Sequence, residues 1–278
     1  MTYEDFTAIT IGIQQGVATV TIDHPPLNLL DSKLIPDLLT FATRVRDDDS
    51  IRVIVFESAD PEFFIAHGDM AFLTDTSLLT DDGELVDGTN PVQMVNEQIR
   101  TLPQITIGKL AGFARGGGNE LLMALDMRFA AIGKGGQAQP ETLQGIYPAG
   151  GGTQYMTALI GRSRALELIL GGELVDAELA ERYGLINRAL PADELDAFVA
   201  TLAHRIAALG PGVIRAVTTA VAAADSTAID LATESAQVAH LHVPDVIASA
   251  HRQLAAGVQT RDGERRLEAL LNELQAAG

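Results

Sequence analysis

The stretch RGGGNELL, residues 115–122, decides the fold, because three consecutive glycines lead here directly into an apolar run. Residues 105–111 before it read as a strand, and residues 121–124 read as part of a buried helix. Glycines at the start of a helix leave backbone N–H groups uncovered at the end where the helix dipole favours negative charge. This stretch therefore predicts an anion site or an oxyanion hole.

Glu120 lies in the first turn of that expected helix. An acid at this position can simply complement the helix dipole. The apolar residues that follow it would also draw its side chain towards the core, where a half-buried carboxylate has a raised pKa and suits acid–base chemistry. Both interpretations of Glu120 stay open on these residues alone.

A second glycine cluster follows at QPE, residues 139–141, and GIYPAGGGTQ, residues 145–154. Pro140 stiffens the approach to Glu141, and the glycine run again opens a helix. Taken in isolation, Glu141 reads as a solvated loop acid. Neither cluster has the spacing of a dinucleotide fingerprint or of a P-loop, which argues against a nucleotide site.

A third segment, FFIAHGDM over residues 63–70, follows an expected strand at 51–57. The small residues Ala66 and Gly68 would let a ligand approach the backbone closely. His67 could serve as a base, but the sequence shows no partner for it, which favours a structural role. His240 and His242 stand two apart in a helical stretch and therefore face different ways, so no metal site is predicted.

Composition bounds the function further. The 278 residues are 47% hydrophobic and 20% charged, as in a chain with an ordinary packed core. The net charge of −18 opposes binding to nucleic acid. The absence of Cys excludes disulfides, thiolate metal sites and a cysteine nucleophile. No signal-peptide pattern and no apolar run of about 20 residues is found, so we expect a cytoplasmic protein without a membrane partner.

The order of elements indicates an α/β chain. The expected strands cover residues 9–13, 17–22, 51–57, 105–111 and 127–132, and the expected helices cover 31–46 and 91–101. After residue 150 the pattern is helical apart from 185–190. We therefore expect a core over 1–200 that carries the site, and a helical region over 201–278. The acidic stretch 74–90 reads as a surface loop, or as a loop that covers part of a site.

In their order along the chain, these segments resemble the enoyl-CoA hydratase/isomerase (crotonase) superfamily. Residues 64–70 are similar to its Phe-x-Ala-Gly-Ala-Asp-Ile segment, and residues 112–120 resemble its Gly-x-x-x-Gly-Gly-Gly-x-Glu segment. Further matching segments are HPPLN at 24–28, QPE at 139–141, PAGGGTQ at 148–154, GRSRALEL at 161–168 and AELAERYGL at 177–185. The resemblance covers nearly the whole chain.

The resemblance implies a crotonase (ClpP-like) spiral of ββα units, with a C-terminal helical region that forms trimers or dimers of trimers. It implies an acyl-CoA thioester as substrate and no cofactor beyond that coenzyme A. The backbone N–H groups of Gly68 and Gly117 would form the oxyanion hole, and Glu120 and Glu141 would be catalytic. The expected substrate-binding residues are Ala66, His67, Asp69, Met70 and Gly116.

The implied reaction is the reversible syn addition of water across C2=C3 of a trans-2-enoyl-CoA. A Δ3–Δ2 enoyl-CoA isomerase would need only Glu141 as a proton shuttle. The other possible functions are hydrolysis of the thioester, decarboxylation, and acyl-CoA binding by an oligomer that catalyses no reaction.

Two departures from the family pattern bear on the pocket. His67 stands in place of the usual Gly, and Asn119 in place of a small residue, so a more polar or narrower pocket is expected. The usual Lys after the opening Pro is absent. Candidates for holding the coenzyme A phosphates are therefore Lys33, Arg100, Arg265 and Arg266, and the 74–90 loop is expected to shape the acyl pocket.

Overall fold

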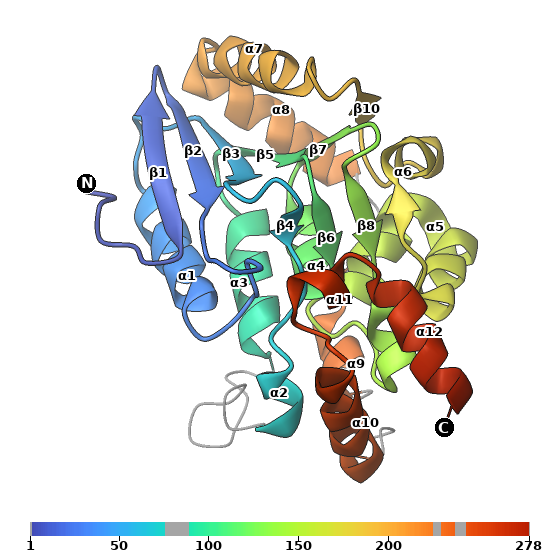
Figure 1. Ribbon diagram of the computed structural model, residues 1–278. Helices are drawn as coiled ribbons and strands as arrows, with labels where there is room; N and C mark the ends of the chain where they lie inside the picture. Colours follow the sequence, from blue (N-terminus) through green and yellow to red (C-terminus); the bar gives the residue numbers. More distant parts are fainter. Residues whose placement is uncertain (1, 76–88, 225–228, 237–242, 278) are drawn as a thin grey trace.

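The computed structural model describes residues 2–75, 89–224, 229–236 and 243–277 (Figure 1). Its strands are β1 (Ile9–Gln14), β2 (Val17–Ile22), β3 (Val53–Ser58), β4 (Phe63–Ile65), β5 (Ile105–Leu110), β6 (Phe113–Arg115), β7 (Met127–Ala131), β8 (Gly136–Ala138), β9 (Val175–Asp176) and β10 (Arg188–Leu190). Its helices are α1 (Leu34–Arg46), α2 (Ala71–Thr74), α3 (Pro91–Arg100), α4 (Gly117–Ala124), η2 (Pro140–Gln144), α5 (Gly152–Gly171), α6 (Ala177–Tyr183), α7 (Leu195–Ala207), α8 (Pro211–Ala224), α9 (Leu231–Ala236), α10 (Val243–Ala255), α11 (Arg261–Glu264) and α12 (Leu267–Ala277).

Six strands form the larger sheet, in the order β1-β2-β3-β5-β7-β10. The first two strands make an antiparallel hairpin in which Ile9 pairs with Ile22 and Gln14 with Val17. All other neighbours in this sheet are parallel. The hairpin and the long strands agree with the sequence prediction.

A smaller sheet lies beside it, in the order β4-β6-β8-β9. Each of β3, β5 and β7 in the larger sheet is followed by a three-residue strand in the smaller sheet, and then by helical structure. The chain thus repeats a ββα unit, which confirms the spiral that the resemblance implied. The ends of β4, β6 and β8 lie together, so the segments that follow them, which contain His67, Gly116 and Gln139, are neighbours.

Helices cover both faces of the larger sheet (Figure 1). Residues such as Val20, Ile54 and Phe56 point to one face and pack with α1, α3 and α4. Val53, Val55 and Ile107 point to the opposite face and pack against α7. Residue 200, the expected end of the core, lies inside α7, so this helix belongs with the sheet.

Local capping sets the helix boundaries. The expected helix over 31–46 begins only at Leu34, because the carboxylate of Asp31 accepts the backbone N–H groups of Lys33 and Leu34 at 2.9 Å each. Asn90 caps α3 in a reciprocal capping box with Gln93. Most of the acidic stretch 74–90, together with His240 and His242, lies outside the described residues.

No single helix in the described ranges is long and apolar enough to cross a membrane. Two consecutive helices, Leu195–Ala207 and Gly212–Ala223, reach that length and composition only when counted together, and they are bent by 105° to each other.

Candidate active site

Glu120 is held by the start of a neighbouring helix. Its carboxylate is almost fully buried, and its Oε1 accepts the N–H groups of Gly150 at 2.8 Å and Gly152 at 2.9 Å. Burial, together with the negative charges of Glu141 and Glu234, raises its pKa well above the usual value, against the opposing effect of the two N–H donors. The expectation of a buried acid with a raised pKa is met.

Glu141 is buried as well, so reading it in isolation as a solvated loop acid is wrong. It lies in η2, where Pro140 occupies the first turn. Burial raises the pKa of Glu141 to about 7, although its own backbone N–H and the charge of His67 oppose this shift. Its Oε2 has no hydrogen-bond partner in the described part of the chain. The result is a carboxyl group that gains or loses a proton near neutral pH.

Two glycines near these acids have backbone N–H groups without an acceptor in the described part of the chain. Gly68 forms an isolated parallel bridge with Leu30 that uses the carbonyl of His67 and the amide of Asp69, at 3.0 Å each. The N–H of Gly68 is left out of this bridge. Gly117 is the first residue of α4, so its N–H has no acceptor within the helix. Neither amide has an acceptor among the described residues.

Glycine is needed at the approach to α4. Gly116 has a φ of +50°, and a Cβ there would come within 3.0 Å of Glu141 Oε1. A Cβ on Gly117 would come within 2.8 Å of a Leu30 methyl carbon. A larger residue at position 116 would displace Glu141, and one at position 117 would displace Leu30, the bridge partner of Gly68. The two glycines therefore allow the acids and the amides to lie close together.

These groups line one cavity of about 150 Å³. Its lining includes Gly68, Gly116, Gly117, Glu120 and Glu141. The predicted substrate-binding residues His67, Asp69 and Met70 also line it. Apolar side chains complete the wall, namely Phe72, Leu73, Val92 and Ile146. The cavity can therefore hold an apolar group beside two acids and two free N–H donors.

Two residues from the sequence analysis lie elsewhere. Ala66 packs in a buried cluster with Leu27 and Phe63 instead of lining the cavity. The expectation that Asn119 makes the pocket more polar or narrower is wrong, because Asn119 does not line the cavity. Asn119 is fully buried, where its Oδ1 accepts from Gln137 at 2.7 Å and its Nδ2 lies 2.9 Å from the side-chain amide of Gln139.

His67 has a partner that the sequence did not reveal. Its Nε2 lies 3.0 Å from Oε1 of Glu264 in α11, and its Nδ1 lies 2.6 Å from the carbonyl oxygen of Gly68. Both ring nitrogens are therefore engaged, so His67 is not free to act as a base. The two residues are 197 positions apart, which is why the sequence alone gave no sign of the pair.

Another buried acid, Glu234 in α9, was not foreseen either. It accepts the N–H groups of Gly151 at 2.7 Å and Thr153 at 3.1 Å, and the side-chain amide of Gln93 at 3.0 Å. It does not line the cavity among the residues described. Its role is to hold the same helix start that Glu120 binds.

Most of the basic residues expected to bind the coenzyme A phosphates already form ion pairs with carboxylates. Arg100 pairs with Glu97, Arg265 with Glu62, and Arg266 with Glu273. Lys33 is exposed, and it forms no ion pair within the described ranges. Those ranges also contain no group of three or more His, Asp or Glu side chains arranged to hold a metal ion.

The chain is similar to known proteins over more than two thirds of its length. The chain is 36% identical over 200 residues to the "Probable enoyl-CoA hydratase echA8" of Mycobacterium bovis, which covers 70% of this chain and 72% of that protein. It is 30% identical over 216 residues to the "Crotonyl-CoA hydratase" of Syntrophomonas wolfei, covering 77% and 80% of the two chains.

Among solved structures, the crystal structure of a "putative enoyl-CoA hydratase" from Streptomyces avermitilis superposes with a TM-score of 0.91 and 43% identity. The match covers 98% of this chain and 99% of that one. The sequence profile of the enoyl-CoA hydratase/isomerase family matches residues 12–262. Since this match spans most of the chain, the protein belongs to the enoyl-CoA hydratase/isomerase family.

Proposed function

We propose that this chain catalyses the reversible syn addition of water across the C2=C3 bond of a trans-2-enoyl-CoA. One observation carries the proposal: Glu120 and Glu141, both buried acids with a raised pKa, face the same small cavity as the unpaired N–H groups of Gly68 and Gly117. The proposed reaction uses no cofactor other than the coenzyme A of the substrate.

The two amides act on the thioester. Its carbonyl oxygen accepts hydrogen bonds from the N–H groups of Gly68 and Gly117, which stabilise the negative charge as the enolate forms. A donor of this kind contributes about 3–4 kcal/mol to transition-state stabilisation in other acyl-transfer enzymes. Both donors are fixed before substrate binds, one by the Leu30 bridge and the other by the start of α4.

The two acids act on the water and on C2. Burial and mutual repulsion favour one shared negative charge on the pair near neutral pH. We assign the charge to Glu120, because two N–H groups reach its Oε1, and the proton to Glu141. Water adds to C3 as Glu120 takes its proton, and Glu141 gives its own proton to C2. A proton transfer from Glu120 to Glu141 restores the starting state.

The spectrophotometric assay of crotonyl-CoA hydration tests this proposal. We expect the wild type to remove the absorbance of the conjugated thioester, and Glu120→Gln and Glu141→Gln each to lower the rate by roughly 10²–10⁴-fold. Glu178→Gln, a change of an exposed glutamate in α6, is the matched control and should retain the wild-type rate. A wild type that binds 2-enoyl-CoAs of several lengths without hydrating them would contradict the proposal and favour the binding oligomer.

The alternative, isomerisation, is supported by Oε2 of Glu141, which has no hydrogen-bond partner in the described part of the chain. Glu141 could then carry a proton along the substrate without the help of Glu120. This alternative predicts that Glu120→Gln remains active on a 3-enoyl-CoA while Glu141→Gln does not. The hydratase proposal predicts that both variants are impaired.

We also propose that the chain forms a homo-oligomer, a trimer or a dimer of trimers. The supporting observation is an exposed apolar row on α8, where Val213, Val217 and Val221 are 52%, 57% and 64% exposed at helical spacing. Light scattering at several protein concentrations checks this: a monomer at all of them would refute it.

A further inference from the structure

The ring of His67 lies between two oxygen acceptors. The Gly68 carbonyl oxygen is 2.6 Å from Nδ1, and Oε1 of Glu264 is 3.0 Å from Nε2. A carbonyl oxygen can only accept a hydrogen bond, so Nδ1 must carry a proton. Oε1 of Glu264 also accepts the N–H of Gln259 at 2.8 Å. Burial would raise the pKa of Glu264, but the nearby His67 and this hydrogen bond outweigh burial and hold the pKa below its usual value. With Glu264 ionised, Nε2 donates to it, and His67 is an imidazolium.

A second buried pair has the same polarity. Arg115, fully buried at the end of β6, donates to Glu268 of α12 at 2.6 and 3.1 Å. In both pairs the cation comes from the segment beside the cavity and the anion from the C-terminal segment.

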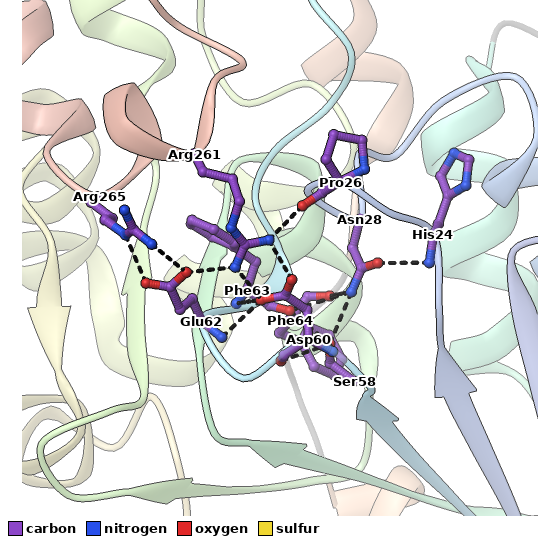
Figure 2. A network of polar contacts seen from close by, with 10 residues as sticks. All are labelled: His24, Pro26, Asn28, Ser58, Asp60, Glu62, Phe63, Phe64, Arg261 and Arg265. Atoms are coloured by element: carbon purple, nitrogen blue, oxygen red, sulfur yellow. Dashed lines mark hydrogen bonds and ion pairs between the residues drawn. The ribbon is translucent and has the colours of Figure 1, made fainter.

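The C-terminal segment that supplies both anions is firmly anchored. Figure 2 shows Arg261 donating to the Pro26 carbonyl, to Asp60 and to Glu62, with Arg265 on Glu62 as well. In Figure 1 the segment crosses in front of β6 and α4. These contacts hold α11 in a fixed place, and Glu264 with it.

The His67–Glu264 pair is oriented with respect to the cavity. His67 and Gly68 line the cavity, whereas Glu264 is fully buried behind His67 and is not part of the lining among the described residues. Of the two members of the pair, the positive one, His67, is thus the one that lines the cavity. A fixed charge in a buried site interacts more strongly than one in water.

We propose that Glu264 is a positioning residue that keeps His67 an imidazolium, so that a positive charge stands behind the Gly68 oxyanion donor. The inference rests on the proposed hydration reaction, because the charge acts on the enolate that this reaction forms. It gives a reason for the histidine where the family has glycine: the imidazolium strengthens the oxyanion hole.

The pH at which the imidazolium is lost depends on all charges around it. Burial alone would lower the pKa of His67, but the charge of Glu264 and the hydrogen bonds to Glu264 and Gly68 outweigh it and raise the pKa above its usual value. Arg115 opposes this rise, while Glu268 partly neutralises Arg115. Glu141 also faces His67, whose charge lowers the pKa of Glu141. His67 therefore keeps its charge to a higher pH than an ordinary histidine and loses it as the pH rises through the raised pKa.

A nitrogen-15 NMR titration of histidine-labelled protein tests the charge directly, with His67 assigned by the loss of its signals in His67→Gln. In the wild type we expect both ring nitrogens to resonate as protonated nitrogens through pH 7. In Glu264→Gln we expect the midpoint to fall by at least one pH unit. Asp262→Asn is the matched control, since Asp262 lies on the same short helix with a side chain 94% exposed, and it should leave the midpoint unchanged.

The activity profile supplies the second readout. Glu264→Gln should move the alkaline limb of kcat/KM to lower pH. Above the wild-type midpoint, its rate relative to wild type should be lower by about tenfold for each pH unit by which the midpoint has dropped. The rate should recover as the pH is lowered, since the imidazolium then returns. A uniform loss at every pH would mean that Glu264 only supports the fold, and would overturn the inference.

The two proposals fail separately. If His67 of the wild type is neutral between pH 6 and 7, this inference is overturned even if the enzyme hydrates crotonyl-CoA. This measurement is made on the wild type, so it does not depend on the folding of any variant. A charged His67 in a protein inert towards enoyl-CoAs overturns the proposed function, and with it the link to an enolate, but leaves the charge assignment standing.

Discussion

Two buried glutamates hold the start of α5, and they differ in what else they face. Glu120 accepts the N–H groups of Gly150 and Gly152, whereas Glu234 accepts those of Gly151 and Thr153. Glu234 uses both oxygens in hydrogen bonds with protein groups. Glu120 uses only Oε1, and its Oε2 has no such partner in the described part of the chain.

The difference lies in the free oxygen. Both acids are buried and both stabilise the same helix start, so burial and N–H donors do not distinguish a catalytic acid from a structural one. The acid that lines the cavity with an unused oxygen can bind water, and the other cannot.

The largest effect is expected from Glu120→Gln, which sharpens this comparison. The amide oxygen can still accept the N–H groups of Gly150 and Gly152, so the fold and the affinity for acyl-CoA should survive. The base is lost, so kcat should fall by roughly 10²–10⁴-fold. Steady-state hydration kinetics and equilibrium binding check this, and a loss of less than tenfold would contradict the assigned role.

Glu141→Gln should raise stability at neutral and alkaline pH. The folded-state pKa of Glu141 is about 7 and lies above its ordinary value of 4.5, so the folded state favours the protonated form. The stability from this group is complete below the ordinary value and is lost as the pH rises through the folded pKa. Glutamine carries no charge and avoids this loss. The free energy of unfolding of Glu141→Gln should therefore exceed that of the wild type by an amount that grows between pH 4.5 and 7 to about 3 kcal/mol.

Urea unfolding of wild type and Glu141→Gln across that pH range measures this gain. Glu178→Gln, exposed on α6, should show no such growing difference. A difference between wild type and Glu141→Gln that does not change with pH would mean that Glu141 titrates normally.

Glu234→Gln should mainly lower stability, because Glu234 accepts donors at both oxygens and lies away from the cavity. Loss of charge-assisted hydrogen bonds of this kind lowers stability by about 1–3 kcal/mol. We expect kcat to fall much less than in Glu120→Gln. Denaturant unfolding measured beside kcat checks the prediction, and a kcat loss as large as that of Glu120→Gln at unchanged stability would make Glu234 catalytic.

A loss of stability of the same size as that of Glu234→Gln should come from Gly152→Ala, which disturbs the helix start without removing an acid. A Cβ there would lie 2.6 Å from Gln139 Nε2 and 2.7 Å from Glu120 Oε1, and overpacking of this kind destabilises by about 1–3 kcal/mol. Gly171→Ala at the other end of α5 meets nothing within 4 Å and serves as the control. Equal melting temperatures of the two variants would count against the contact.

Features set by neighbouring residues could be predicted from the sequence. The hairpin, the long strands and the glycine-led helix α4 depend on alternation and on local glycines. The apolar residues beside Glu120 made its burial one of two open interpretations. The short strands Phe63–Ile65, Phe113–Arg115 and Gly136–Ala138 did not follow, because three residues show no period.

The rest of the site depends on contacts between distant segments. Glu264 meets His67 across 197 positions, and Glu234 meets Gly151 across 83. Nothing local distinguishes either acid from the other acids of the chain. The burial of Glu141 likewise follows from packing around η2 rather than from its own neighbours, which read as a polar loop.

The most direct test of the two-glutamate account is product analysis in water labelled with oxygen-18. We expect crotonyl-CoA to give 3-hydroxybutyryl-CoA with the label at C3 in the wild type, and almost none in Glu120→Gln or Glu141→Gln. A wild type that interconverts 2- and 3-enoyl-CoAs while leaving C3 unlabelled would contradict the account and make the protein an isomerase.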